Sequence, residues 1–392
     1  MAKYRLWTKG VCIIGSVDLI ATATFGLEAV VAREVQLLGY GDARVANGRV
    51  SFKAGPEAIC RANLWLRSAD RVLIRMGEFS ALSFDELFEQ TKALPWADWI
   101  PENANFPVEG KSIKSKLFSV PDCQAIVKKA VVESLKGRYH RQWFEETGPR
   151  CTIEVALLKD VATLTIDATG PGLHKRGYRK LSSAAPLKET LAAAMISLSH
   201  WRAEQPLLDP LCGSGTIPIE AALIGLNIAP GLNREFVAES WPVIPENLWR
   251  DARQEARDLA RRDPQLQVRG TDIDPEVLSL ARYHARQAGV AELISWQQAP
   301  LAELQTKRQY GCIICNPPYG ERMEDAQSVE RLYREMGRVF KSLDTWSFYV
   351  LTAHHGFEKL FGRRAAKKRK LYNGRIECNF YQFFGPPRPH AR

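Results

Sequence analysis

The sequence predicts a doubly wound α/β domain in the second half of the chain, preceded by a smaller α+β region. From about residue 166 onward, short apolar runs alternate with longer stretches whose apolar residues recur at helical spacing, as in parallel strands joined by crossover helices. Before that point, shorter strand-like runs are mixed with single helices. The chain has 392 residues, of which 45% are apolar, so each region can bury a core of its own.

Periodicity and capping signals predict the elements of the N-terminal region. Apolar residues at helical spacing predict a helix over residues 27–38, and Ser83 followed by Glu86 predicts the start of another through a capping box. The stretch CTIEVALLKDVATLTID predicts two strands joined at Lys159 and Asp160. These elements, with the change of pattern near residue 166, predict three domains that cover residues 1–60, 61–165 and 166–392.

Composition indicates the kind of partner and the compartment. The net charge of +10 and the isoelectric point near 9.2 favour a polyanionic partner, although excess Lys and Arg can also serve solubility. Eight cysteines without regular spacing are typical of a reduced cytoplasmic protein. Cys312 and Cys315 lie in an apolar run with no second pair, so we expect no metal site. No segment has the ~18 uninterrupted apolar residues of a membrane span, and Asp18 excludes a signal peptide.

The first motif with chemical content is PLLDPLCGSGTIPIEAAL, a short strand ending at Asp209, a loop with Gly213 and Gly215, and a helix. A dinucleotide-binding turn would have a third glycine where this chain has Pro218, and a carboxylate at the strand end would repel a pyrophosphate. S-adenosylmethionine, which has nucleoside and amino-acid parts and no phosphate, fits better. The glycines would let the backbone approach its amino-acid part, and Asp209 would accept hydrogen bonds from its ammonium group. A plain strand-loop-helix connection is the alternative.

A second strand is predicted to end at Asp272 in VRGTDIDPEV, with Asp274 as N-cap and Pro275 at the first helical position. A carboxylate at this strand end is placed to accept both ribose hydroxyls, and Ile273 could pack on the adenine. Alternatively, both acids only cap the helix, which explains Asp274 better than Asp272. The two strand ends lie further apart than a simple crossover needs, so residues 229–264 are expected to contain an insertion of unknown role.

The hexapeptide CNPPYG follows a third apolar run. Consecutive prolines fix φ and remove amide donors, so the chain is expected to leave the strand in a rigid turn with free carbonyl groups. The Asn316 side chain and the Pro317 carbonyl could together hold the two protons of an exocyclic amino group, while Tyr319 offers a face for stacking. The amino nitrogen would then be aimed at the methyl-sulfonium carbon, so positioning would supply most of the catalysis. A surface turn is the alternative for NPPY alone, but its place after two acid-ended strands favours a methyl-transfer site.

Together, the motifs at Asp209, Asp272 and Asn316 resemble motifs I, II and IV of class I amino-methyltransferases. This resemblance implies a Rossmann-like sheet of seven strands that ends in an antiparallel hairpin. The whole chain is similar to the RlmL-type 23S rRNA guanine-N2 methyltransferases, which join a ferredoxin-like piece and a THUMP RNA-binding domain to the catalytic domain. The similar segments are NGRVSFKAG, ANLWLRSADRVLIRMGEF, VEGKSIKSKLFSVPDCQAIVKKA, GLHKRGYRK, APLKETLAAA and KKRKLYNGRIECNFYQFF.

The resemblance implies methylation of N2 of a specific guanine in 23S rRNA, free or in a large-subunit assembly intermediate, with S-adenosylhomocysteine as the second product. It implies catalytic roles for Asn316, Pro317 and Tyr319. Recognition of the adenine is expected to fall to Gln298 or to the main chain, because WQQAPLAEL lacks the acid often found after the third strand. The implied cofactor site consists of Asp209, Cys212, Gly213, Ser214, Gly215, Thr216, Asp272, Ile273, Gln298 and Asn316.

The charge distribution adds candidate contacts to RNA. Eight Lys or Arg and no acid lie between residues 359 and 375, and further cations cluster near residues 111–116 and 175–180. A solvated face is the alternative for such runs. The expected phosphate contacts are Lys111, Lys114, Lys116, Lys175, Arg176, Arg179, Lys367, Lys368, Arg369 and Lys370.

Other functions share parts of this pattern. Release-factor glutamine methyltransferases share NPPY but have a helical N-terminal domain, and DNA amino-methyltransferases usually add a large target-recognition domain. A non-catalytic RNA-binding factor would need neither Asp272 nor Asn316. The main alternative is a THUMP-containing tRNA guanine-N2 methyltransferase, which differs chiefly in the HKRGYR and C-terminal stretches, so the sequence leaves the choice between rRNA and tRNA open.

Overall fold

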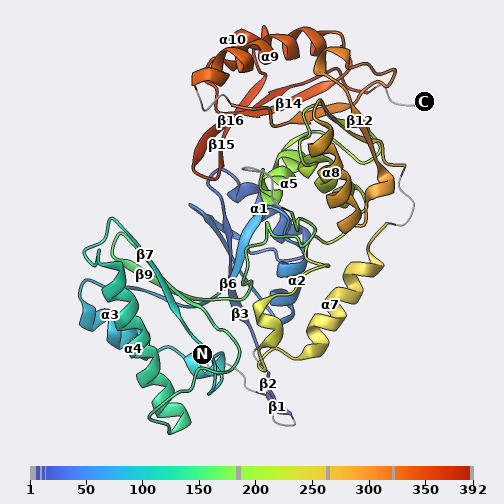
Figure 1. Ribbon diagram of the computed structural model, residues 1–392. Helices are drawn as coiled ribbons and strands as arrows, with labels where there is room; N and C mark the ends of the chain where they lie inside the picture. Colours follow the sequence, from blue (N-terminus) through green and yellow to red (C-terminus); the bar gives the residue numbers. More distant parts are fainter. Residues whose placement is uncertain are drawn as a thin grey trace. The chain divides into compact units, whose positions relative to one another are not determined.

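The computed structural model describes residues 6–8, 11–13, 15–181, 187–261, 265–319 and 323–388. The chain forms two compact units, each built around a sheet of seven strands (Figure 1). The first unit contains Met1–Ala23, Ala32–Leu173 and Glu235–Glu255, and the second contains Thr24–Val31, His174–Arg234 and Ala256–Arg392. The division between the units therefore falls inside two helices, α1 (Glu28–Leu37) and α7 (Glu246–Asp258). In the described part of the chain, no helix is long and apolar enough to cross a membrane.

The sheet of the first unit has the order β4-β5-β3-β6-β9-β8-β7, and only the β7–β8 pair is parallel. The long strand β6 pairs with β3 through its first half and with β9 through its second half, so one strand serves both halves of the sheet. The expected boundary after residue 60 falls within α2 (Glu57–Trp65). The strands are β3 (Val17–Ala23), β4 (Arg44–Ala46), β5 (Arg49–Ala54), β6 (Ala69–Ser80), β7 (Val108–Ile113), β8 (Ile153–Leu158) and β9 (Val161–Asp167), with a separate pair of β1 (Leu6–Thr8) and β2 (Val11–Ile13).

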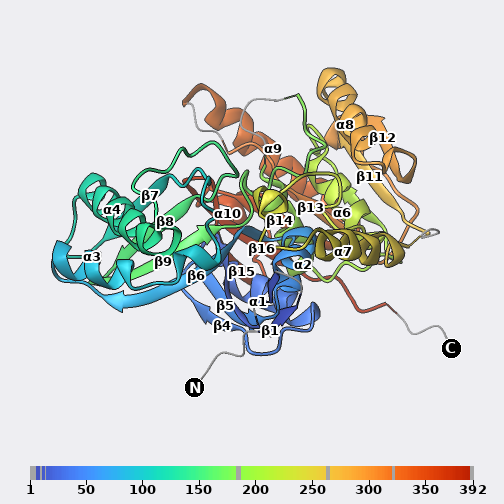
Figure 2. The ribbon, with the colours of Figure 1, turned by 90° about the horizontal axis from the view of Figure 1, so that it is seen from below.

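Local signals in the first unit produce the predicted elements. Ser83 caps α3 (Phe84–Lys92) by accepting a hydrogen bond from the Glu86 backbone N–H, and α1 confirms the helix predicted near residues 27–38. Helix α4 (Val120–Tyr139) packs beside α3, as Figure 2 shows. The β8–β9 hairpin turns at Lys159 and Asp160, which both adopt positive φ, so this prediction is confirmed although lysine is an unusual residue there. A short 3-10 helix covers Trp96–Asp98.

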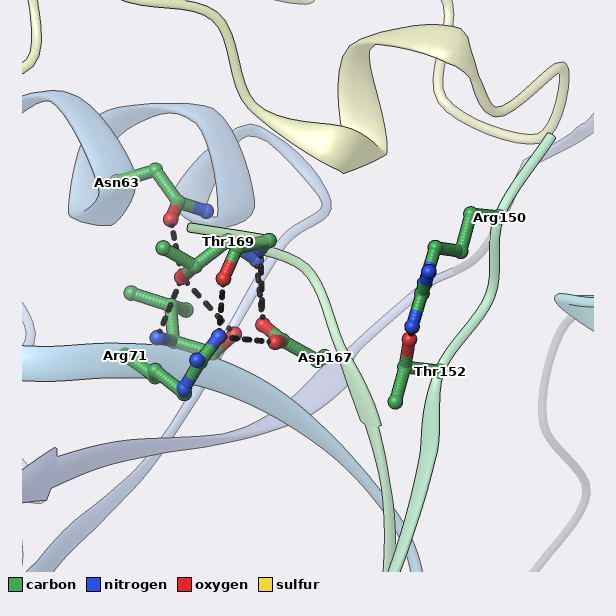
Figure 3. A network of polar contacts seen from close by, with 8 residues as sticks. Asn63, Arg71, Arg150, Thr152, Asp167 and Thr169 are labelled. Carbon is green, nitrogen blue, oxygen red and sulfur yellow. Dashed lines mark hydrogen bonds and ion pairs between the residues drawn. The ribbon is translucent and has the colours of Figure 1, made fainter. Parts of the chain in front are cut away.

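A polar network joins β6, α2 and the end of β9 (Figure 3). Arg71 donates hydrogen bonds to the Asp167 carboxylate and to the Gly170 carbonyl, and the backbone N–H groups of Thr169 and Gly170 donate to Asp167 Oδ1 at 2.8 and 3.2 Å. The Thr169 hydroxyl lies 2.7 Å from Asn63 Oδ1. Burial raises the pKa of Asp167, and the three donors, Arg71 and the two backbone N–H groups, oppose that effect. The network therefore fixes the path of the chain as it leaves β9.

The second unit has the predicted doubly wound sheet, with the order β12-β11-β10-β13-β14-β16-β15. The first five strands in this order are parallel, and β16 runs antiparallel to both of its neighbours, which confirms the terminal hairpin. The strands are β10 (Leu207–Asp209), β11 (Val268–Asp272), β12 (Ile294–Gln298), β13 (Cys312–Cys315), β14 (Ser347–Thr352), β15 (Lys367–Asn373) and β16 (Ile376–Phe383).

Side chains of this sheet alternate between two apolar layers. In β13, Cys312 and Ile314 belong to one buried cluster, and Ile313 and Cys315 belong to the other. The first cluster includes residues of α5 (Glu189–Leu198), α6 (Thr216–Gly225) and α8 (Pro275–Gln287); the second includes residues of α9 (Met323–Lys341) and α10 (Phe357–Phe361). The remaining described helices are three short 3-10 helices: Val237–Ser240 in the first unit, and Ala291–Leu293 and Leu301–Glu303 in the second. The two cysteines of the CxxC therefore lie on opposite faces of the sheet, an arrangement unsuited to shared coordination of one metal ion.

Two segments belong to a different unit from the one their sequence position suggests. Thr24–Val31 is part of the second unit, where Leu27 and Val30 join the apolar core and the Gly26 carbonyl accepts a hydrogen bond from Arg369. Conversely, Glu235–Glu255 lies within the expected insertion but is part of the first unit. There Trp241 Nε1 donates to the Arg150 carbonyl at 2.9 Å.

Candidate active site

The candidate site lies where the parallel strands of the second unit end. Asp209 is the last residue of β10, Asp272 is the last residue of β11, and Asn316 directly follows β13. Strand β10 lies between β11 and β13, so the three residues follow adjacent strands at the same edge of the sheet. In doubly wound folds this edge holds the ligand, because the strand order reverses there and leaves a crevice between loops.

Asp209 is a buried carboxylate without a basic partner among the described residues. Its Oδ1 accepts one hydrogen bond, from the Leu211 backbone N–H at 3.2 Å. Burial, together with the nearby Asp272, raises the pKa of Asp209 well above its ordinary value. A buried acid in this position favours a cationic ligand group, which would restore the ionised form.

The loop after β10 has two glycines with different structural roles. Gly213 has φ +50°, and a Cβ atom there would meet no protein atom within 4 Å, so the loop leaves space at this point. Gly215 has φ +84°, and a Cβ atom would lie 2.7 Å from the Trp296 ring. Gly213 is therefore the position at which a ligand can approach the backbone, whereas Gly215 lets the loop pack on Trp296. Trp296 was missed at the sequence level because it lies on β12, far from the motif.

Asp272 has a role distinct from capping. Its two carboxylate oxygens accept hydrogen bonds from the backbone N–H groups of Gly213 (2.8 Å) and Asp274 (3.1 Å). Asp274 is the N-cap of α8 and accepts from the Glu276 N–H at 2.8 Å, which confirms that prediction. The Ile273 side chain is 66% exposed and is available to pack on a planar ligand. Gln298 pairs with Asp272 in the sheet and donates to the Ile273 carbonyl at 3.2 Å, so it holds this loop in place.

The NPPY turn is more tightly bonded than its sequence predicts. The Pro318 carbonyl accepts a 2.7 Å hydrogen bond from Tyr333, so the expectation that the turn's carbonyls are free is wrong for this one. Pro317 is buried, and its carbonyl accepts no hydrogen bond from any described residue. Tyr319 is half-buried, and its hydroxyl donates to Asn316 Oδ1 and accepts from Asn373 Nδ2 at 3.3 Å. Gly320, the last residue of the hexapeptide, lies outside the described residues.

Two arginines expected to contact RNA are instead internal to the second unit. The Arg176 side chain is 2% exposed and pairs with the fully buried Glu220 at 3.3 Å, and the Tyr178 hydroxyl donates to the same carboxylate. Arg179 is largely buried, pairs with Glu189 at 3.4 Å, and donates to the Thr216 hydroxyl. This corrects the expectation for both residues, because a buried and paired guanidinium cannot meet a phosphate.

The remaining residues of the loop rest on this buried layer. Thr216 is buried beneath Arg179, and the Ser214 carbonyl lies 3.2 Å from Nδ1 of the buried His284. Cys212 is also buried, and burial together with Asp209 raises the pKa of its thiol well above the ordinary range. The buried side chains of Thr216 and Cys212 and the contact of the Ser214 carbonyl with His284 therefore hold the loop in place.

All but one of the other predicted RNA contacts lie on exposed positions. Lys114, Lys116 and Lys175 are exposed, and Lys111 is exposed while pairing with Glu154 at 2.7 Å. Lys367, Lys368 and Lys370 are exposed on β15, which is the edge strand of its sheet. Lys368 and Lys370 have acidic partners, Glu358 at 3.2 Å and Glu377 at 2.9 Å. Arg369 is half-buried and bonded to the Gly26 carbonyl, so its role is at least partly structural.

Comparison with family models assigns all three regions of the chain. A model described as an RlmL ferredoxin-like domain matches residues 18–73, a THUMP domain matches residues 81–167, and an RMKL-like methyltransferase domain matches residues 176–382. This chain is a THUMP-containing methyltransferase of the RlmL family. Methyl transfer by this class of domain uses S-adenosylmethionine, which fits the unpaired acid at Asp209, the open loop at Gly213 and the acid at Asp272.

Individual relatives of this RlmL-family chain agree with the assignment over nearly its full length. YpsC of Bacillus subtilis (strain 168), which is provisionally named an RNA methyltransferase, is 52% identical over 376 residues, or 95% of this chain and 97% of YpsC. The crystal structure of SMU.472 complexed with S-adenosylhomocysteine has 48% identity and a TM-score of 0.91, covering 96% of this chain and all of that one. A structure described as a predicted N6-adenine-specific DNA methylase, from Listeria monocytogenes, has 55% identity and the same TM-score, covering 95% and 97%.

Proposed function

We propose that this RlmL-family enzyme methylates the exocyclic N2 of a specific guanine in 23S rRNA, either free or in a large-subunit assembly intermediate. The observation that carries the proposal is the position of Asn316 and Pro317, whose carbonyl is bonded by no residue that the structure describes, directly after the strand next to the one that ends in Asp209, with Asp272 at the same edge of the sheet. The THUMP domain and the charge of +10 support an RNA partner. The proposal includes a cytoplasmic location, which the free cysteines among the described residues support.

The cofactor would be held by residues of three adjacent loops. Asp209 would accept hydrogen bonds from the ammonium group, and Gly213 would let the backbone approach the amino-acid part. Asp272 would accept the ribose hydroxyls, with the exposed Ile273 side chain packing on the adenine. Gln298 would act through the Ile273 carbonyl that it bonds. Bound S-adenosylmethionine supplies a methyl group on a positively charged sulfur.

Asn316 and Pro317 would position the attacking nitrogen. The Asn316 carboxamide oxygen and the Pro317 carbonyl oxygen can each accept one proton of the guanine amino group. This would leave the nitrogen lone pair directed at the methyl carbon, so that the N–C bond would form as the bond between sulfur and the methyl carbon breaks and S-adenosylhomocysteine is left. The nitrogen would then release one proton to solvent. Acceptors placed in this way stabilise the positive charge that develops on nitrogen, so a strong base is unnecessary.

RNA would be held by exposed cations outside the candidate active site. In the first unit these are Lys111, Lys114 and Lys116, and in the second unit they are Lys175 and the β15 lysines Lys367, Lys368 and Lys370, with Arg369 contributing where its bond to Gly26 allows. Contacts of this kind bind the phosphate backbone and give affinity without selecting a base. Selection would then depend on presenting one guanine at Asn316, flipped from its stem if necessary, with stacking on Tyr319.

The proposal is tested by mapping modified bases in cells that lack this protein. Mass spectrometry should show that one N2-methylguanine is lost from 23S rRNA and that the tRNA modifications are unchanged. Purified enzyme with labelled S-adenosylmethionine should then methylate 23S rRNA from those cells, with transfer to bulk tRNA at least tenfold slower. Preferential labelling of tRNA would support the tRNA alternative, and label in N6-methyladenine would refute guanine as the target.

A further inference from the structure

Three side chains beside the NPPY turn form a directed chain of hydrogen bonds. Asn373 Nδ2 donates to the Tyr319 hydroxyl at 3.3 Å, and that hydroxyl donates to Asn316 Oδ1. Asn316 and Tyr319 belong to the turn after β13, whereas Asn373 ends β15 and is 54 residues from Tyr319 in the sequence. The terminal hairpin therefore reaches the residues proposed to bind the substrate amino group.

The chemistry of the three groups fixes the direction of the chain. A carboxamide nitrogen only donates, a carboxamide oxygen only accepts, and a tyrosine hydroxyl has one proton to donate. The Asn373 amide uses a lone pair of the Tyr319 oxygen, so the hydroxyl proton is left for an acceptor. The Cys378 thiol is also within reach of this hydroxyl, but sulfur is a weak acceptor, and the proton is donated to Asn316 Oδ1. One lone pair of that oxygen remains for a substrate amino proton.

The same bonds prevent an unproductive rotamer of Asn316. If its carboxamide turned over, the NH₂ group would meet the Tyr319 hydroxyl proton on one side and the substrate NH₂ group on the other. The carbonyl oxygen would then be unavailable to the substrate. A donor held at Oδ1 therefore favours the orientation that methyl transfer requires.

Asn373 is not needed to form the hairpin or to place the Tyr319 ring. The two-residue turn depends on Gly374, which has φ +64°. Asn373 is the last paired residue of β15 and lies opposite Ile376. The Tyr319 ring already packs against the large apolar cluster of the unit, and burial raises the pKa of its hydroxyl, so it remains a neutral donor. The polar contact of Asn373 thus adds orientation to a side chain that is already buried.

We propose that Asn373 is a positioning residue for methyl transfer, acting through the Tyr319 hydroxyl to hold Asn316 Oδ1 toward the substrate amino group. This inference rests on the proposed function insofar as Asn316 is the acceptor for that group. It does not depend on which base or which RNA is methylated. It adds a residue from the C-terminal hairpin to a site otherwise built from the strand-end loops.

The decisive variant is Asn373→Asp, which keeps the shape of the side chain but can only accept at neutral pH. The Tyr319 proton then turns toward the new carboxylate, and Asn316 Oδ1 loses its donor. We expect the single-turnover rate of label transfer from S-adenosylmethionine to fall at least tenfold, with total RNA from cells lacking the protein as substrate. Binding of S-adenosylhomocysteine, measured by calorimetry, should stay within twofold. The matched control is Asn379→Asp on β16, which makes the same change of charge in the same hairpin and should keep the wild-type rate.

A double-mutant cycle separates positioning from a structural effect. Tyr319→Phe removes the hydroxyl and keeps the ring, so adding Asn373→Asp to it should change the rate less than twofold. A wild-type rate in Asn373→Asp, or an equal loss in the two backgrounds, would overturn the inference. Because the assay counts label in any RNA, label in tRNA or in a base other than guanine would refute the proposed function while still measuring the effect of Asn373.

Discussion

The backbone N–H of Gly213 donates a 2.8 Å hydrogen bond to Asp272 Oδ2, which ties the loop after β10 to the end of β11. The second oxygen of the same carboxylate accepts from the Asp274 N–H. The two loops that are proposed to hold the cofactor are thus connected through one side chain. Such a connection reduces the ordering that ligand binding requires.

We therefore expect Asp272 to affect cofactor binding in two ways, through the ribose and through the Gly213 loop. Asp272→Ala removes the proposed ribose contacts, each charge-assisted bond being worth about 1.5–3 kcal/mol, and also releases Gly213. We expect affinity for S-adenosylmethionine to fall at least tenfold in calorimetry. Asp274→Ala serves as the control, since it removes only the cap of α8. Unchanged affinity in folded Asp272→Ala would reduce this residue to a backbone anchor.

Cofactor binding should release a proton from Asp209. Burial keeps this carboxyl protonated at pH values above its ordinary pKa of 3.8. Its contribution to the free energy of unfolding is therefore complete below pH 3.8 and is lost as the pH rises toward the pKa that the group has in the folded protein. A bound ammonium group favours the ionised form, so affinity for S-adenosylhomocysteine should rise with pH across this range, by up to about tenfold per unit. Calorimetry in two buffers with different ionisation enthalpies measures the proton directly. Asp209→Asn should bind more weakly and show no buffer dependence, and proton uptake by wild type would contradict the assignment.

Asn316 should matter for the chemical step far more than for the cofactor. We expect Asn316→Ala to lower the single-turnover rate of methyl transfer at least a hundredfold, because the lost acceptor acts on the nitrogen in the transition state. Calorimetry should show nearly wild-type affinity for S-adenosylhomocysteine. Tyr319→Ala should have a smaller effect on rate and should also weaken RNA binding. A near-normal rate in Asn316→Ala would remove it from the catalytic site.

The lysines of β15 should contribute to the salt dependence of RNA binding. Changing Lys367, Lys368 and Lys370 to Gln should flatten the log-log salt slope by up to ~0.7–0.9 per lost phosphate contact. Arg369 is left intact because it also bonds the Gly26 carbonyl. The control changes three exposed cations elsewhere, Arg250, Lys307 and Lys341, and so removes the same charge. Equal slopes for the two triple variants would make the β15 lysines part of a solvated face.

Changing two neighbouring cations to Ala should affect different properties: stability for Arg176 and RNA binding for Lys175. Arg176→Ala leaves the buried Glu220 with the Tyr178 hydroxyl but without its charged partner, so we expect it to lower the free energy of unfolding by about 3–5 kcal/mol. Lys175→Ala should leave stability unchanged and weaken RNA binding, since this lysine is exposed. Thermal unfolding and filter binding measure the two effects. A stable Arg176→Ala protein with weakened RNA binding would restore the original expectation for Arg176.

The strand ends and the site loops could be predicted because their signals are local, whereas the seven-stranded sheet was implied by the resemblance to class I amino-methyltransferases. An apolar run ending in Asp209 or Asp272, followed by a cap such as Asp274, is read within about ten residues of sequence. The role of Arg176 could not be predicted, because its partner Glu220 is 44 residues away and a basic run gives the same pattern whether exposed or buried. The placement of Glu235–Glu255 in the first unit was hidden for the same reason, since it depends on distant contacts such as that between Trp241 and Arg150.

The docking of Thr24–Val31 in the second unit has a consequence for synthesis. Gly26 leaves the ribosome 343 residues before its partner Arg369. At ~5–20 residues per second, the nascent chain therefore carries Leu27 and Val30 without their final core for roughly 17–70 s. The core of the second unit can be completed only after the β15–β16 hairpin has been synthesised. An mRNA truncated before codon 367 would therefore yield a chain in which Thr24–Val31 lacks its native contacts with this hairpin.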